Sequence, residues 1–166
     1  MKYLLLSLFF LSSIAMGDSL EVLTGGITYH LFMNPEISAQ FSNKLNGDGS
    51  LIFNQLYGLK YTKQDDIFYS SYSLFGGNNS IAEPMGGALY SFGIEVDHID
   101  LGIAAGGYLQ DASLFQQRGI DTTSFMPILG FECNYKIDVG RKYFVKINNL
   151  LSVLMYNLSA SIGKDF

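Results

Sequence analysis

Few side chains in this chain could carry acid–base chemistry, and His30 is the first of them. The 166 residues include two histidines and one cysteine. A set this small and scattered does not give the usual spacing of a zinc site. Neither a phosphate-binding glycine loop nor a G-x-S-x-G nucleophile turn is present. We therefore expect no metal and no other cofactor.

A histidine with a hydroxyl and other polar partners in reach can act as a general base on an acyl ester. His30, Asn79 and Ser80 are the candidate catalytic residues on this basis. The alternative is that His30 lies at an interface or in a lumen without a catalytic role. The second histidine, His98, stands in an acidic turn sequence, Asp97-His98-Ile99-Asp100, which indicates a solvated surface residue.

The elements that must position these residues are strands. From residue 154 to 166, apolar and small polar side chains alternate with a period of two, as in a strand whose faces meet different surroundings. The pattern ends on an aromatic residue and is typical of the closing strand of an outer-membrane β-barrel. The mostly apolar face carries Leu154, Tyr156, Leu158, Ala160, Ile162, Lys164 and Phe166; the other carries Met155, Asn157, Ser159, Ser161, Gly163 and Asp165.

Eight segments in all have the length and pattern of strands, and the connections between them alternate between long and short. This predicts an all-β fold, an eight-stranded antiparallel up-and-down transmembrane β-barrel of the outer-membrane type. Both termini would be periplasmic, and the extracellular rim would carry His30, Asn78, Asn79, Ser80 and Asp111. A secreted soluble β-sandwich or barrel is the alternative. The predicted strands are 25–33, 51–62, 67–75, 85–96, 101–110, 125–137, 142–148 and 154–166, with outer loops at 34–50, 76–84, 111–124 and 149–153.

The N-terminal segment predicts export. Lys2 precedes an apolar run over residues 3–11, and Ala15-Met16-Gly17 offers a small-residue cleavage site. Residues 1–17 are expected to be a signal peptide and 18–166 a single barrel domain, with residues 18–24 as a short polar lead-in. The net charge of −5 argues against nucleic acid as a partner, and a lone cysteine excludes an internal disulfide.

The face opposite the apolar one carries unusually small side chains, which bears on what the barrel could hold. An eight-stranded barrel has room for its own side chains or for one slender ligand. The small residues could leave space for an acyl chain, or the glycines could simply relieve crowding and permit bending. Three charged residues, Lys60, Glu132 and Lys136, are expected to pair with one another. The small residues of the expected lumen are Gly87, Ser91, Gly93, Gly102, Ala104, Gly106, Ser159, Ser161 and Gly163.

Several short motifs resemble one known family. The segment Ile27-Thr28-Tyr29-His30 resembles the strand that carries the catalytic histidine in the lipid A palmitoyltransferases of Gram-negative outer membranes (PagP-like). Residues 75–86 (FGGNNSIAEPMG) resemble the second outer loop of that family, and residues 101–111 (LGIAAGGYLQD) resemble its following glycine-rich strand. Pro127 falls where the family has a proline that interrupts strand pairing and opens a lateral gate.

The resemblance implies an enzyme that moves a palmitoyl chain from a phospholipid to lipid A. It makes His30 the base and membrane lipids the partners of a monomeric barrel. Asn79 and Ser80 are the polar residues nearest to the positions of the family's Asp-Ser pair, and Glu83 or Asp111 could orient the base. A lipid A deacylase would pair His with Ser two residues on, where this chain has Phe32. A non-enzymatic barrel that modulates the surface or binds a ligand is the alternative function.

Overall fold

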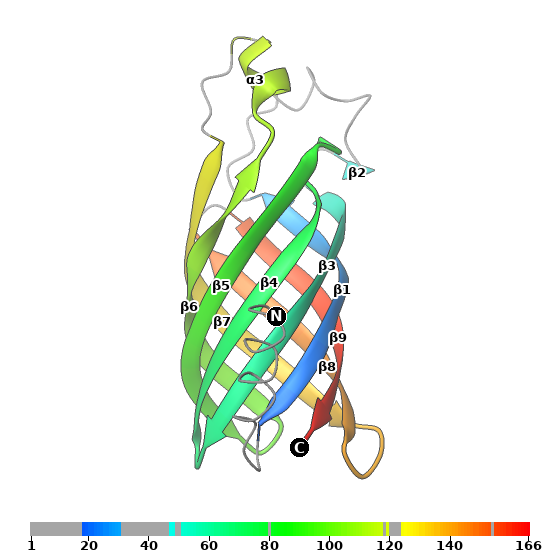
Figure 1. The fold of residues 1–166 in the computed structure, drawn as a ribbon, viewed down its shortest axis with the longest axis vertical. Helices are drawn as coiled ribbons and strands as arrows, with labels where there is room; N and C mark the ends of the chain where they lie inside the picture. The colour runs from blue at the N-terminus through cyan, green and yellow to red at the C-terminus, as the bar shows by residue number, and fades with distance from the viewer. Residues whose placement is uncertain are drawn as a thin grey trace, which may run out of the picture.

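The computed structural model describes residues 18–30, 47–48, 51–79, 81–117, 119, 124–153 and 155–166. Nine strands and one short helix occupy these residues (Figure 1). Within them, no helix is long and apolar enough to cross a membrane. The elements are β1 (Ser19–His30), β2 (Gly47–Asp48), β3 (Leu51–Asp65), β4 (Phe68–Asn78), β5 (Pro84–Val96), β6 (Ile99–Gln110), α3 (Ser113–Gln117), β7 (Phe125–Asp138), β8 (Tyr143–Ser152) and β9 (Met155–Asp165).

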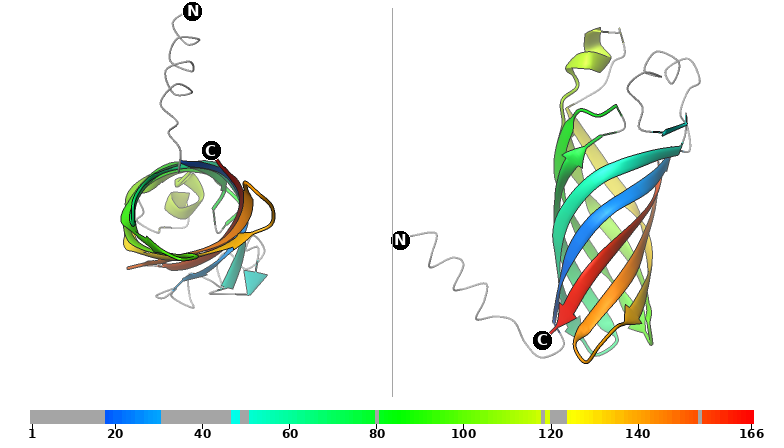
Figure 2. Two further views of the ribbon diagram at one scale, coloured as in Figure 1. Left: turned by 90° about the horizontal axis from the view of Figure 1, so that it is seen from below. Right: turned by 90° about the vertical axis from the view of Figure 1, so that its right-hand side faces the viewer.

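The eight long strands form a closed antiparallel barrel, which confirms the predicted fold class. The order around the sheet is β1-β9-β8-β7-β6-β5-β4-β3, and pairing of β1 with β3 closes the ring (Figure 2). That closing ladder runs from Ser19↔Thr62 to Tyr29↔Leu51. The two-residue β2 pairs with the start of β3. Asp18 and Phe166 meet at one end of the barrel, where the Phe166 N–H donates to the Asp18 carbonyl oxygen at 2.9 Å.

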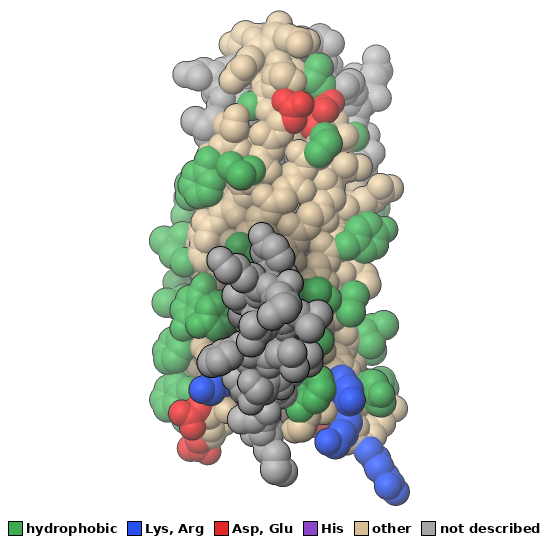
Figure 3. Space-filling view, in the orientation of Figure 1, with side chains coloured by type: hydrophobic (Ala, Val, Ile, Leu, Met, Phe, Trp, Pro, Cys, Tyr) green, Lys and Arg blue, Asp and Glu red, His purple; other side chains and the backbone are tan. Residues whose placement is uncertain are grey.

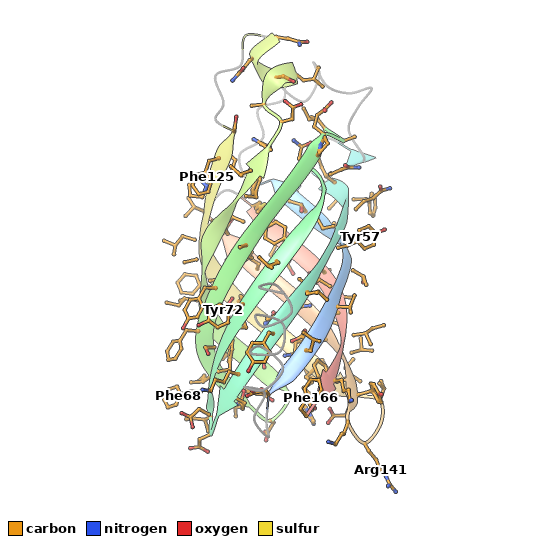
Figure 4. All side chains as sticks on the ribbon, viewed as in Figure 1. Tyr57, Phe68, Tyr72, Phe125, Arg141 and Phe166 are labelled. Carbon is orange, nitrogen blue, oxygen red and sulfur yellow. The ribbon has the colours of Figure 1, made fainter. Side chains whose placement is uncertain are left out.

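Side chains alternate between the two faces as the period of two predicts. On β7, the expected outward residues Phe125, Leu129 and Phe131 are exposed. The labelled side chains Tyr57, Phe68, Tyr72 and Phe125 point away from the barrel wall (Figure 4). Exposed apolar residues of the long strands include Leu20, Val22, Tyr29, Phe53, Tyr57, Leu59, Phe68, Tyr72, Leu74, Tyr90, Phe92, Leu101, Ile103, Leu109, Phe125, Leu129, Phe131, Tyr135, Ile137, Tyr143, Ile147, Leu151 and Ile162.

The faces of β4 could not be assigned from its sequence, and the structure assigns them. Tyr69, Ser71 and Ser73 are buried in the lumen, whereas Tyr72 and Leu74 are exposed. Neighbouring strands supply the reason, because β5 presents rings at the matching outward positions. The Tyr72 and Tyr90 rings lie 5.0 Å apart between centroids, a cross-strand aromatic pair that stabilises this register.

Several predicted boundaries are wrong. β3 and β4 run to Asp65 and Asn78, beyond the predicted strand ends at residues 62 and 75, so residues 76–78 belong to a strand and not to an outer loop. Residues 19–24 are not a lead-in, because β1 begins at Ser19 and pairs on both sides, with β3 and β9. Residues 149–152 are not an outer loop, since they continue β8 in register with β7 and β9. Most of the predicted loop 34–50 and the whole predicted signal peptide lie outside the described residues. The predicted loop 111–124 contains α3.

Candidate functional site

Two lumen glycines that were candidates for lining a ligand space make room instead for the protein's own rings. A Cβ atom at Gly102 would collide with the Tyr69 hydroxyl, and one at Gly163 would collide with the Phe144 ring. Both aromatic side chains are almost fully buried. At these two levels the glycines therefore relieve crowding, and the space they leave is filled by Tyr69 and Phe144.

A network of buried charges fills the same half of the lumen. The Lys146 ammonium contacts Asp100 Oδ2 at 2.8 Å and Glu21 Oε1 at 3.4 Å. Glu21 also accepts a hydrogen bond from the Ser161 hydroxyl at 2.5 Å. The Lys146 ammonium also lies 5.3 Å from the centre of the Phe144 ring. Buried carboxylates in a barrel need such partners, and the network ties β1, β6, β8 and β9 together.

The predicted pairing among the three lumen charges is right for two of them. Lys60 Nζ lies 3.8 Å from Glu132 Oε2, and both side chains are buried. The Tyr69 hydroxyl donates to the same Glu132 oxygen at 3.4 Å. Lys136 instead pairs with Asp165 at 2.9 Å, because its place on β7 is near the end of the barrel where β9 ends. The Lys60–Glu132 pair forms the floor of the space above it.

Above this floor lies a cavity of about 130 Å³ in the upper half of the lumen. It is close in size to an engineered 150 Å³ core cavity that holds one benzene molecule. Its apolar lining residues include Leu56, Phe75, Leu89, Tyr108, Ile128 and Met155, and its polar ones include Thr28, Lys60, Glu132, Asn134, Asn148 and Asn157. The cavity is therefore amphipathic.

The wall of the barrel is interrupted beside this cavity. The ladder between β7 and β8 ends at Gly130↔Ser152, so residues 125–129 extend beyond it while still pairing with β6. Pro127 lies in this stretch and has no N–H to donate. A second cavity of about 360 Å³ occupies the gap, lined by residues that include Met126, Pro127 and Leu129. The two cavities share Tyr108, Ile128 and Met155, which form the partition between them.

Carboxamide side chains bridge a second break in the β7–β8 ladder. The ladder skips Cys133 and Asn134 between Glu132↔Leu150 and Tyr135↔Ile147. Asn149 fills the break: its N–H donates to Asn134 Oδ1 at 3.2 Å and its Nδ2 to the Cys133 carbonyl at 2.7 Å. The Tyr156 hydroxyl donates to Asn149 Oδ1 at 2.6 Å. The sequence analysis did not single out these asparagines. Carboxamide side chains within strands that are otherwise mostly apolar could have indicated a break in strand pairing.

The structure brings only part of the predicted catalytic set into view. His30 is the last residue of β1 and pairs with Met155 of β9; its side chain lies outside the described set, as does the whole of Ser80. Asn79 is buried and lines the upper cavity. Its Oδ1 accepts from the N–H groups of Ile81 at 3.1 Å and Glu83 at 2.9 Å, and its Nδ2 donates to Gln110 at 3.1 Å. Asn79 thus shapes the β4–β5 turn, and a catalytic role for the set stays a prediction.

The two acids proposed to orient the base lie near this turn. Asp111 is exposed, and its Oδ1 accepts the Ser113 N–H at 2.9 Å. This hydrogen bond lowers the pKa of the Asp111 carboxyl, because it favours the ionised form. The Asp111 N–H also donates to the Pro84 carbonyl at 3.3 Å, next to Glu83. At the opposite end, His98 is exposed with Nδ1 3.9 Å from Asp138 Oδ2, which confirms it as a surface residue.

Comparisons with known proteins show likeness in fold alone. No protein-family model matches the chain, and no curated protein matches it. Among solved structures, the Yersinia pestis outer membrane protein Ail shares 11% identity over 90% of this chain and 99% of its own, with a TM-score of 0.48. The N-terminal β-barrel domain of Pseudomonas aeruginosa OprF shares 15% identity over 92% and 100%, with a TM-score of 0.46. A de novo designed protein, TMB2.3, shares 10% over 93% and 98%, with a TM-score of 0.49. Similarity this low carries no information about activity or ligand.

Proposed function

We propose that the protein is a small outer-membrane β-barrel whose upper end handles a lipid acyl chain. The apolar outer wall is the observation that supports insertion into a membrane. Hydrophobic side chains cover much of it, and charged side chains gather near its two ends (Figure 3). A soluble barrel would bury such residues, whereas a barrel in lipid turns them outward. Residues 1–17 would direct export, and the end with Asp18 and Phe166 would be periplasmic.

The acyl-chain proposal is supported by the two cavities at the opposite end. A lipid in the outer leaflet would reach the side of β7 at the 360 Å³ cavity, where Tyr108, Ile128 and Met155 separate that cavity from the lumen. A closed ladder would deny this access, since a complete hydrogen-bonded wall leaves no lateral path. The break beside Pro127 is thus the feature that favours a lipid substrate.

The reaction we propose is transfer of an acyl chain from a phospholipid to lipid A, with His30 as general base. His30 would take the proton of the attacking lipid A hydroxyl as the new ester forms. The phospholipid ester bond would break, and His30 would return the proton to the oxygen of the departing lysophospholipid. Asn79 and Ser80 would be its polar neighbours at the rim, and Asp111, ionised at neutral pH, would be available to orient it. The proposed partners are therefore lipid A and phospholipid, bound by a monomer.

One observation favours the second candidate, a barrel without catalytic activity. Both polar atoms of the Asn79 side chain already form hydrogen bonds, to the β4–β5 turn and to Gln110. A structural role is therefore enough to explain this residue. Such a barrel would modulate the surface or bind a ligand.

Mass spectrometry of lipid A decides between these candidates. The protein, its His30→Ala variant and a control His98→Ala variant would be expressed in a Gram-negative host lacking its own palmitoyltransferase. Heat-modifiable gel migration would confirm insertion. Gain of one acyl chain with the wild type and His98→Ala, but not with His30→Ala, supports transfer. Loss of an acyl chain would indicate deacylation, and unchanged lipid A from inserted protein would leave the non-catalytic barrel.

A further inference from the structure

Basic side chains gather on one side of the lower end of the barrel, the end that carries Phe166. Arg141 and Lys142 are exposed in the turn between β7 and β8, and Lys164 is partly buried near the end of β9. The Asp165 N–H donates to the Lys142 carbonyl oxygen at 2.8 Å, which holds the turn against β9. Lys and Arg side chains lie together at this corner (Figure 3), and Arg141 points away from the barrel (Figure 4). We call Arg141, Lys142 and Lys164 the basic corner.

The acids closest to the basic corner in the chain are engaged elsewhere. Asp165 Oδ2 lies 2.9 Å from Lys136 Nζ. Asp138, at the end of β7, has its Oδ2 3.9 Å from His98 Nδ1. Among the residues that the structure describes, no ion pair joins the basic corner to a carboxylate. Its positive charge is therefore available to a partner outside the chain.

Lys164 belongs to the outer wall of the barrel. It follows Ile162, which is 58% exposed, on the outward face of β9. Its partners across the two neighbouring ladders are Tyr143 on β8 and Leu20 on β1, and both are exposed. Directly opposite residues of antiparallel strands have Cβ atoms about 4.5–5.5 Å apart, so these side chains form one row. The Lys164 ammonium also lies 5.0 Å from the centre of the Phe166 ring, a cation–π contact at the edge of the apolar wall.

This row fits a phosphate group at the level of lipid headgroups. The Lys164 ammonium and the Tyr143 hydroxyl can both donate to phosphate oxygens, and the Arg141 guanidinium adds a second cation nearby. The direction of the row indicates where the phosphate comes from. Lys164 and Tyr143 face the same way as the apolar side chains of Ile162 and Leu20, so a phosphate that reaches them belongs to a molecule whose apolar part can lie on that wall.

We infer that the basic corner and Tyr143 bind the headgroup of an anionic phospholipid from the periplasmic leaflet of the outer membrane. The phosphate lies between Lys164 and Tyr143, and the acyl chains run along Ile162 and Leu20. The inference rests on the membrane insertion and orientation in the proposed function. It involves neither acyl transfer nor the upper cavity, which lie at the other end of the barrel.

The test is an NMR titration of the purified full chain in phosphatidylcholine nanodiscs that contain increasing fractions of phosphatidylglycerol. The backbone amides of Lys164 and Tyr143 report on the site. The amides of Asp65 and Asp97, exposed residues in turns at the same end of the barrel, serve as references. We expect saturable shifts at the site and none at the references. Glycerophosphoglycerol, the same headgroup without acyl chains, should give no saturable shift at an equal phosphate concentration.

Four variants separate the site from general attraction between charges. Lys164→Gln and Arg141→Gln should each raise the phosphatidylglycerol fraction at half-saturation roughly fivefold, since one basic residue near an anionic surface contributes about that factor. Tyr143→Phe should raise it roughly threefold, through loss of one hydrogen bond. Lys63→Gln is the matched control, because it removes an exposed lysine at the same end but away from the basic corner, and it should leave the half-saturation fraction unchanged.

Three outcomes would overturn the inference. One is that neither site amide saturates. Another is that glycerophosphoglycerol shifts the amides as strongly as the lipid does, which would indicate a soluble anion. The third is that Lys63→Gln weakens binding as much as Lys164→Gln. All three leave the proposed acyl transfer standing, whereas a chain that fails to insert into nanodiscs would overturn both proposals. Unmodified lipid A together with saturable phosphatidylglycerol binding would refute the proposed reaction alone.

Discussion

Replacement of Lys146 by methionine should strongly destabilise the barrel. Its ammonium is almost fully buried between two carboxylates, 2.8 Å from Asp100 and 3.4 Å from Glu21. Two opposite charges 4 Å apart attract by about 4 kcal/mol at an effective dielectric constant of about 20. Removal of one partner from a buried pair costs about 3–5 kcal/mol, because the other charge stays buried without compensation. We expect a loss in this range in the free energy of unfolding.

The assay is reversible urea unfolding in lipid vesicles, followed by far-ultraviolet circular dichroism because the chain has no tryptophan. With a slope of about 1–3 kcal/mol per molar urea, the midpoint should fall by roughly 2 M. Lys142→Met, which removes an exposed lysine in the β7–β8 turn, should change the free energy by less than about 0.5 kcal/mol. Adding Glu21→Gln and Asp100→Asn to Lys146→Met should recover most of the loss. A loss below about 1 kcal/mol for Lys146→Met, or no recovery in the triple variant, would refute the reasoning.

Three further predictions concern packing, the strand break and the rim. Gly102→Ala should lower the free energy of unfolding by about 1–3 kcal/mol, because the new methyl group collides with the Tyr69 hydroxyl. In a Tyr69→Phe background the same substitution should cost less, and an equal loss with Tyr69 and with Phe at position 69 would contradict the prediction. Asn149→Ala should cost about 1–3 kcal/mol and speed hydrogen exchange of β7 and β8 amides beyond those of β4 and β5, because the ladder break loses its bridging group. Acidification should break the hydrogen bond from the Ser113 N–H to the Asp111 carboxylate. The bond should persist above pH 3.8, the ordinary pKa of an Asp carboxyl, and be lost as the pH falls through the lowered pKa of Asp111. An NMR shift of the Ser113 amide that does not change with pH would contradict this prediction.

The sequence by itself determined the class of fold, the number of long strands and most of their outward faces. The reason is that a period of two is a local property, readable wherever one face is apolar and the other is not. On β7, Phe125, Leu129 and Phe131 alternate with inward residues, and the structure exposes all three as predicted. On β4, Tyr and Ser occur on both faces, so the sequence shows no such contrast. Its inward and outward faces could be assigned only from its contacts with β5.

Only the tertiary structure decided what fills the lumen and where strands end. From the sequence, Gly102 and Gly163 were expected to leave space in the lumen. In the structure Gly102 lies against the Tyr69 side chain and Gly163 against the Phe144 ring, each from another strand. Residues 149–152 were predicted to lie in an outer loop, but they continue β8, and Leu150 and Leu151 pair with both β7 and β9. In each case the deciding partner lies on another strand, and its register is set by pairing across the barrel. A local pattern can predict that a strand exists, whereas the contacts across the barrel are fixed only when all eight strands are in place.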